Sequence, residues 1–440
     1  MKKRYFFCSG MIALASLLMS PSYATTDETR VAMLRSTLDT DVYVDTLDVD
    51  TMAVDASEDA TADDDIEDNN LPGPQNVVER IDHVFKNTTI FNTSMVGMKI
   101  YDLTADSTIY EYNSSQLMRP ASTLKMIVAV TALDRLEADY KFKTRLAYTG
   151  NVEDNILIGN IYCKGGFDPT IGNDDISQFA DSISSLGIDT IQGNICLDYS
   201  MKDKDRLGEG WCWDDDNPVL SPLLAGRKEE FGERLLKRLD KKGIHVTGIC
   251  EEKQIPSSAK TLYVKETLLP EVMRRQLKRS DNLYSEAIFY QIAADAAGRG
   301  TATAKYGRQA VNRLISKLGF KPSAYYIADG SGLSLYNYVS PELEVAFLKY
   351  AYQHSAIYDN LLPCLPVAGE DGTLAKRMRT GAAHGNVKAK TGTVTGVSSL
   401  AGYCTAANGH KLCFSIINMG IRYASSGRNF QDKVCQALCK

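Results

Sequence analysis

Two residues near the start of an apolar run have the types and spacing of a catalytic pair. Ser122 and Lys125 form a Ser-x-x-Lys motif in this 440-residue chain. Residues three apart share one face of a helix, so the hydroxyl and the amine can meet. Burial disfavours a charged amine, and an uncharged amine can accept the proton of a serine nucleophile. Ser257 and Lys260 have the same spacing, and we interpret that pair as a coincidence in a loop.

A second motif combines a hydroxyl with an amide. Ser280-Asp281-Asn282 precedes an amphipathic stretch, Leu283 to Ala294, that predicts a helix. The hydroxyl of Ser280 could pass on a proton while the Asn282 amide binds a substrate carbonyl. Taken by itself, Ser280 is better explained as a simple helix N-cap.

A third motif, Lys390-Thr391-Gly392-Thr393, opens a run of β-branched and small residues that extends to Tyr403. This composition predicts a strand that lines a site. Gly392 would let a substrate backbone approach closely. Lys390 and the hydroxyls of Thr391 and Thr393 can hold a carboxylate.

The three motifs in this order are far more specific than any one alone. Ser-x-x-Lys, Ser-Asp-Asn and Lys-Thr-Gly are the signature set of penicillin-recognising serine enzymes. The chain resembles the D-alanyl-D-alanine carboxypeptidase/endopeptidases, the class C low-molecular-mass penicillin-binding proteins, over about residues 76 to 420. Further sequence motifs of this family occur at 119–121, 165–170, 329–334, 365–374 and 396–403.

The resemblance implies a serine peptidase that forms an acyl-enzyme. Ser122 would attack the carbonyl between two D-alanines of a peptidoglycan stem peptide, or a D-alanyl cross-link. Lys125 would be the base for acylation, while Ser280 and Lys390 would relay a proton to the leaving amine. β-Lactams resemble the same dipeptide and would acylate Ser122. No metal or organic cofactor is implied, and which of the two activities dominates stays open.

The same resemblance suggests how the substrate is held. Asn282 would bind the acyl-donor peptide, and Thr391 and Thr393 the terminal carboxylate. In the family, an aspartate at the end of a tryptophan-containing turn meets the free amine of the stem peptide's third residue. By motif position Asp215 is the best candidate for this role, with Asp214 next. The alternative is a tryptophan anchor beside a solvated acidic turn.

Two other functions remain as alternatives. A serine β-lactamase shares all three motifs but needs a group that activates water against the acyl-enzyme, and the sequence shows no convincing motif for one. A non-catalytic wall-binding or β-lactam-sensing module is the second. Intact Ser122, Lys125, Ser280 and Lys390 argue against it, because a retired site should lose at least one of them.

The predicted fold class is α/β (α+β): a transpeptidase-like antiparallel sheet flanked by helices, with one inserted, mostly β domain. The core is expected from 76–140 and 266–440, and the inserted domain from 141–265. Relatives usually carry a further domain nested within the insertion, which this chain lacks. Helices are predicted at 77–85, 124–136 (buried on nearly all sides), 174–186, 229–242 and 431–438, with a mostly helical section over 261–352. Strands are predicted at 95–103, 108–112, 144–148, 156–163, 190–197, 385–389, 397–404 and 411–418.

The N-terminal segments predict export. Lys2 to Arg4 precede a short apolar stretch, and small residues end at Ala24, so 1–24 reads as a signal peptide cleaved after Ala24. The mature protein would then be periplasmic, without a stable membrane span. Residues 25–75 are predicted to be a disordered acidic tether, since 41–70 hold twelve Asp or Glu and no Lys or Arg. A net charge of -6 and a pI of about 5.6 disfavour nucleic acid as a partner.

Cysteine usage is the last feature with a structural consequence. Cys8 leaves with the signal peptide, and nine cysteines remain. Asn408-Gly409 predicts a two-residue hairpin turn that would place Cys404 opposite Cys413. A cross-strand disulfide is therefore possible, although two small buried thiols are the favoured interpretation.

Overall fold

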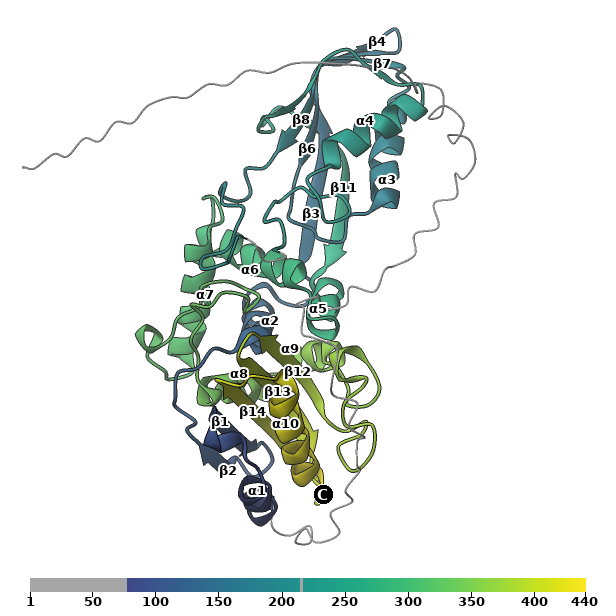
Figure 1. Ribbon diagram of the computed structural model, residues 1–440. Helices are drawn as coiled ribbons and strands as arrows, with labels where there is room; N and C mark the ends of the chain where they lie inside the picture. The colour runs from purple at the N-terminus through teal and green to yellow at the C-terminus, as the bar shows by residue number, and fades with distance from the viewer. Residues whose placement is uncertain (1–76, 214–216) are drawn as a thin grey trace, which may run out of the picture. The chain divides into compact units, whose positions relative to one another are not determined.

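The computed structural model describes residues 77–213 and 217–440 (Figure 1). The predicted signal peptide, the acidic tether and both candidate carboxylates for the third-residue amine, Asp214 and Asp215, lie outside the described residues. Within the described ranges, no helix is long and apolar enough to cross a membrane.

A five-stranded antiparallel sheet is built from both flanks of the predicted insertion (Figure 1). Its order is β12-β13-β14-β1-β2. The strands are β1 (Met95–Asp102), β2 (Ser107–Tyr112), β12 (Lys388–Val394), β13 (Val397–Thr405) and β14 (Lys411–Met419). Pairing of β1 with β14 joins the N-terminal flank to the C-terminal one. The predicted antiparallel core sheet is thereby confirmed, with β12 beginning at Lys388, later than the sequence suggested.

Helices cover both faces of this sheet. On one face lie α1 (Val77–Lys86) and α10 (Ala424–Cys439), and on the other α2 (Leu124–Leu136) and α8 (Pro341–Gln353). Because successive side chains of a strand point to opposite faces, both faces of β13 and β14 are buried. This explains why these strands read as continuous apolar runs rather than alternating ones.

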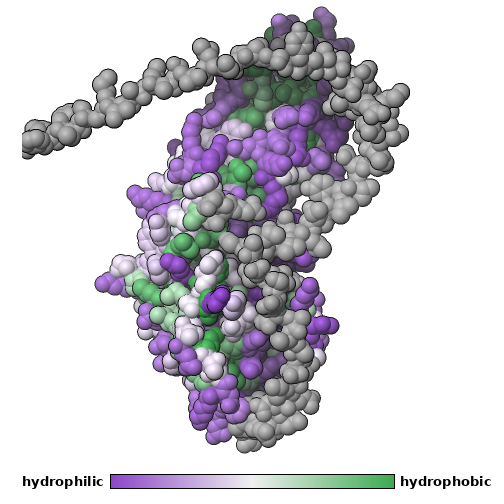
Figure 2. Space-filling view, viewed as in Figure 1, coloured by the Kyte–Doolittle hydropathy of each residue, from purple (hydrophilic) through white to green (hydrophobic). Residues whose placement is uncertain are grey.

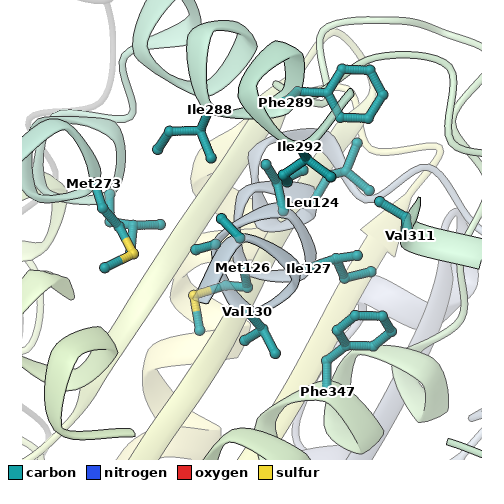
Figure 3. Packing of buried hydrophobic residues seen from close by; sticks show 14 of the residues in the cluster. Leu124, Met126, Ile127, Val130, Met273, Ile288, Phe289, Ile292, Val311 and Phe347 are labelled. Atoms are coloured by element: carbon teal, nitrogen blue, oxygen red, sulfur yellow. The ribbon is translucent and has the colours of Figure 1, made fainter. Parts of the chain in front are cut away.

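The helix α2, predicted over 124–136, has these bounds in the structure. Its apolar side chains pack against those of the surrounding helices, and every residue of α2 except Asp134 and Arg135 is buried (Figure 3). The surrounding helices include α5 (Leu269–Lys278), α6 (Asn282–Ala297), α7 (Ala304–Lys317) and α8. A helix packed on all sides is held rigidly, and its first turn carries Lys125.

The remaining elements of this part are short. They are α9 (Ser355–Leu361) and the 3-10 turns η1 (Ile90–Asn92), η2 (Ala121–Thr123), η3 (Pro322–Ala324), η4 (Leu362–Cys364) and η5 (Gly372–Leu374). Of these, η2 contains Ser122 and η5 lies beside β12.

The inserted segment is mostly β, as predicted, and has a hydrophobic cluster of its own. A mixed sheet of order β10-β8-β6-β3-β11 contains β3 (Lys141–Tyr148), β6 (Ile161–Lys164), β8 (Ile195–Asp198), β10 (Cys250–Glu252) and β11 (Lys260–Leu268). A smaller sheet of order β4-β5-β7-β9 contains β4 (Asn151–Glu153), β5 (Ile156–Ile158), β7 (Thr190–Gln192) and β9 (His245–Val246).

Two amphipathic helices, α3 (Asn173–Ser184) and α4 (Phe231–Lys241), pack their apolar faces into this cluster. Their bounds agree with the predicted helices near 174–186 and 229–242. Hydrophilic residues dominate the visible surface in this region, as the outward faces of such helices require (Figure 2).

Two strand predictions within the insertion and the start of the helical section were wrong. The predicted strands 156–163 and 190–197 are each two strands, because the chain passes from the small sheet to the large one at Gly159 and Gly193. A side chain at Gly193 would overlap the carbonyl of Gly159, so glycine allows the two crossings to pass each other. The predicted helical section also begins too early, since β11 continues to Leu268 and pairs with β3.

The expected register, with Cys404 opposite Cys413, was also wrong, whereas the favoured interpretation of two buried thiols agrees with the structure. The turn closes through Ala406 and His410, one residue earlier than expected, so Cys404 lies opposite Leu412 and Cys413 opposite Tyr403. A shift of one residue sends a side chain to the other face of the sheet. Cys404 packs with α10 and Cys413 with the α2 side, and both are free, buried thiols.

Candidate active site

The predicted serine–lysine pair meets at the junction of η2 and α2. Nζ of Lys125 lies 2.7 Å from Oγ of Ser122. The same amine donates to Oδ1 of Asn282 at 2.8 Å and to the carbonyl of Ser331 at 2.7 Å. Lys125 is fully buried, whereas Ser122 is partly exposed. The arrangement joins the first two motifs in one hydrogen-bonded group and leaves the hydroxyl open to a ligand.

Two residues at the site have a backbone conformation that disfavours any residue but glycine. Ala121, directly before Ser122, has a φ of 49°, and Ser280 has a φ of 59°. Such conformations cost on the order of 1–3 kcal/mol each and persist where the surrounding structure holds them, often at functional sites. No sequence pattern indicated this strain.

The second motif begins α6, and its three residues have separate tasks. Asp281, not Ser280, is the N-cap, because its side chain accepts a hydrogen bond from the backbone N–H of Tyr284. The N-cap explanation for Ser280 is therefore wrong. Oγ of Ser280 instead accepts from Nζ of Lys390 at 2.8 Å, which joins the second motif to the third.

Asp281 is held by two arginines. Its carboxylate accepts from Nη1 of Arg227 at 2.6 Å and from Nε of Arg275 at 2.9 Å. Burial opposes the charged form, but the hydrogen bonds and charges of Arg227 and Arg275 outweigh it and lower the pKa of Asp281. Since Arg227 comes from the inserted segment, that segment helps to fix the loop that carries Ser280.

The third motif lies on β12 with its lysine inside and its threonines outward. Lys390 is fully buried, and its amine also donates to the carbonyl of Thr391. Thr391 and Thr393 are partly exposed. Oγ1 of Thr391 donates to Oγ1 of Thr373 at 2.8 Å, and Nη2 of Arg428 lies 3.5 Å from Oγ1 of Thr393. Arg428, on α10, adds a cation to this edge that sequence reasoning missed.

The structure requires glycine at position 392 for a different reason from the predicted approach of a substrate backbone. A side chain there would overlap Oγ of Ser399 and lie 2.8 Å from the Pro120 carbonyl and 2.9 Å from the Ser122 backbone nitrogen. The space that glycine leaves free is thus occupied by the nucleophile's own turn. Gly392 allows β12 and η2 to lie against each other, with Ser122 beside the Lys-Thr-Gly strand.

Sequence reasoning also missed Glu286, which lies one turn after Asn282 on α6 and is buried. Both of its oxygens accept from the backbone N–H of Gly330, at 3.0 and 3.1 Å. Burial and the nearby carboxylate of Asp329 raise the pKa of Glu286 to about 8. No sequence pattern distinguishes Glu286 from other polar residues of an amphipathic helix. The neighbouring segment 329–334, in contrast, matches a sequence motif of the family.

The geometry supports nucleophilic acyl transfer. The site contains two serine–lysine pairs, Ser122 with Lys125 and Ser280 with Lys390, and both serines are partly exposed. One pair can remove a proton from the attacking oxygen while the other returns a proton to a leaving group. Throughout 77–213 and 217–440, His, Cys, Asp and Glu side chains nowhere gather in groups of three or more that could hold a metal ion.

Comparison with known proteins gives a family and several relatives. The sequence model of the D-Ala-D-Ala carboxypeptidase 3 (S13) family matches residues 77–227 and 220–439. A D-alanyl-D-alanine carboxypeptidase DacB of Haemophilus influenzae is 26% identical over 406 residues, covering 73% of this chain and 84% of that protein. A D-alanyl-D-alanine carboxypeptidase of Actinomadura sp. (strain R39) is 26% identical over 440 residues, covering 78% of this chain and 80% of that protein.

Solved structures share the fold. Penicillin binding protein 4 (dacB) from Haemophilus influenzae has a TM-score of 0.71 at 23% identity, covering 81% of this chain and 99% of that one. A predatory peptidoglycan endopeptidase from Bdellovibrio bacteriovorus has a TM-score of 0.54 at 18% identity, covering 78% of this chain and 92% of that one.

Proposed function

The chain belongs to the D-Ala-D-Ala carboxypeptidase 3 (S13) family, and on that premise we propose that it is a serine D-Ala-D-Ala carboxypeptidase acting on peptidoglycan stem peptides. The observation that carries this proposal is the position of the Lys125 amine. It lies within hydrogen-bond distance of Oγ of Ser122 and of Oδ1 of Asn282 at once. A base that touches both the nucleophile and a peptide-binding amide is suited to acylation by a peptide.

In the proposed reaction Ser122 attacks the carbonyl of the penultimate D-alanine, and Lys125 takes the hydroxyl proton. The backbone N–H groups of Ser122 and Thr393 would stabilise the oxyanion, since Gly392 brings β12 directly against the nucleophile's turn. Ser280 then passes a proton to the leaving amine of the last D-alanine, with Lys390 as its hydrogen-bonded source. Water hydrolyses the acyl-enzyme and completes the cycle.

The terminal carboxylate would be held at the outer edge of β12. Thr391 and Thr393 offer hydroxyls there, and Arg428 adds a guanidinium next to Thr393. Charge-assisted hydrogen bonds of this kind favour a free carboxylate over a neutral amide. A D-alanyl cross-link would undergo the same chemistry at Ser122, and β-lactams, which carry a carboxylate beside a reactive amide, would acylate it.

Work on peptidoglycan requires the enzyme outside the cytoplasm. We therefore retain the proposal of a periplasmic protein, exported by the segment 1–24. We also propose that 141–265 form a separate domain, which its own hydrophobic cluster supports.

The lifetime of the acyl-enzyme separates a peptidase from the β-lactamase alternative. With benzylpenicillin we expect an adduct that persists for minutes or longer, because the sequence shows no convincing motif for a group that activates water against the acyl-enzyme. The measurement is the decay of the adduct mass after excess penicillin is removed. Rapid turnover of benzylpenicillin would favour the lactamase instead.

The role proposed for Asp215 is recognition of a diamino acid. Asp215→Asn should lower kcat/KM for peptides with a free amine at position three by about tenfold or more, since a tenfold change is about 1.4 kcal/mol. Acylation by benzylpenicillin should barely change, because benzylpenicillin has no such amine. Steady-state kinetics on peptides with and without the amine provide the comparison. Equal losses on both substrates would make Asp215 structural.

A further inference from the structure

Three consecutive residues of the inserted segment, Glu209 to Trp211, contact the core; we call them the strap. Oε1 of Glu209 accepts from the hydroxyl of Tyr326 at 2.6 Å, and Oε2 forms an ion pair with Arg308. These contacts fix the first residue of the strap to the core.

Gly210 brings the strap into close contact with a loop of the core that lies beside the nucleophile. Its φ is +76°, and a side chain there would lie 2.7 Å from both Oγ of Ser334 and Cδ2 of Tyr336. Only glycine combines this backbone conformation with so close an approach. The strap is therefore shaped to lie directly on residues 334–336.

Trp211 connects the strap to a buried carboxylate. Its Nε1 donates to Oδ2 of Asp329 at 2.8 Å, and Asp329 is 2% exposed. The same carboxylate accepts from the backbone N–H groups of Gly332 and Ser334, at 2.8 and 2.7 Å. Asp329 thus sets the conformation of its own loop, 329–334, and Trp211 holds Asp329 from the inserted segment.

This loop in turn contacts both members of the catalytic pair. The carbonyl of Ser331 accepts from Nζ of Lys125 at 2.7 Å. At Gly332, where φ is +80°, a side chain would overlap the Ala121 carbonyl and lie 3.2 Å from the Ser122 backbone nitrogen. A displacement of this loop would therefore move the Ser331 carbonyl, which accepts from Lys125. It would also disturb the backbone of Ala121 and Ser122, against which Gly332 lies.

We propose that Trp211 is a positioning residue for acylation: by holding Asp329 it fixes the Ser331 carbonyl, and through it the Lys125 amine, beside Ser122. The inference rests on the proposed function. It gives the inserted segment a part in the chemical step, separate from any recognition of the stem peptide.

Trp211→Phe tests the proposal because it removes the N–H donor and keeps an aromatic ring. The readouts are the second-order rate constant of acylation by benzylpenicillin, and kcat and KM for a peptide ending in D-Ala-D-Ala. Each rate is expressed per site that labelled penicillin can titrate, so unfolded protein does not count. We expect acylation and kcat to fall about tenfold, equivalent to about 1.4 kcal/mol, with KM little changed.

The chain supplies its own matched control. Trp213 is the other tryptophan and is 86% exposed, so Trp213→Phe should leave the acylation rate per site unchanged. If Trp211→Phe does not fold, Gly210→Ala displaces the strap without replacing any side chain of the active site. It should slow acylation per site in the same way.

The outcomes separate the two proposals. A wild-type rate per titrated site in Trp211→Phe or Gly210→Ala, or a loss of sites without slower acylation of those that remain, would show that the strap only stabilises the fold. If the unaltered protein neither takes up penicillin nor releases D-alanine, the proposed function fails, and the positioning role fails with it.

Discussion

Ser122→Ala is expected to abolish both the hydrolysis of D-Ala-D-Ala peptides and covalent labelling by penicillin. The hydroxyl of Ser122 is the partly exposed oxygen that Lys125 contacts, and alanine leaves no atom to form the acyl bond. Labelled penicillin followed by gel electrophoresis measures the adduct, and release of D-alanine measures turnover. If penicillin labelled Ser122→Ala as strongly as the wild-type protein, Ser122 would not be the nucleophile.

Ser257→Ala is the matched control for this experiment. Ser257 begins the other Ser-x-x-Lys sequence of the chain, is exposed, and lies in a turn before β11. Its replacement should change neither labelling nor turnover.

Lys125→Ala is expected to slow acylation by about 10² to 10⁴-fold, the range usual for loss of a general base. The variant loses the proton acceptor and also leaves the Asn282 amide oxygen and the Ser331 carbonyl without their donor. The rate should fall for penicillin and for peptide alike, because both need the same deprotonated Ser122. Stopped-flow or quenched acylation kinetics give the rate constant.

Lys260→Ala controls for the loss of a lysine with the same sequence spacing. Lys260 is exposed on β11, and its amine lies 5.6 Å from the ring centre of Tyr148. Its removal should leave acylation unchanged. An effect of Lys125→Ala no larger than a few-fold would show that another group accepts the serine proton.

The chemistry of the site was predictable because it depends on short local patterns. Ser122 and Lys125 share a helical turn, so their contact follows from spacing alone, and the bounds of α2 follow from its apolar sequence. The contacts of Lys125 with Asn282, and of Lys390 with Ser280, could be expected only from the resemblance to a family. In sequence they are far apart, and no local pattern encodes them.

Other parts of the site were not predictable because they act through backbone atoms or buried contacts. Every residue type has a backbone carbonyl, so the sequence gives no signal that the carbonyl of Ser331 accepts from Lys125. Glu286 looks like any polar residue of an amphipathic helix. The sequence indicates Trp211 only as an anchor or as part of a recognition turn, because its contact with Asp329 joins segments that are far apart in the chain.

The errors in the sheets have one physical origin, which is that local composition does not determine register or the sheet to which a strand belongs. At the β13–β14 turn one extra residue sufficed to place Cys404 and Cys413 on opposite faces. At Gly159 and Gly193 a continuous strand-like sequence changes sheets.

The most direct test of the central claim is release of D-alanine from a stem pentapeptide ending in D-Ala-D-Ala by the purified protein. We expect one D-alanine per peptide, with release stopped by benzylpenicillin at one equivalent of titrated sites and the penicilloyl group located on Ser122 by peptide mass mapping. No release from a protein that binds penicillin, or an adduct on any residue other than Ser122, would contradict the account.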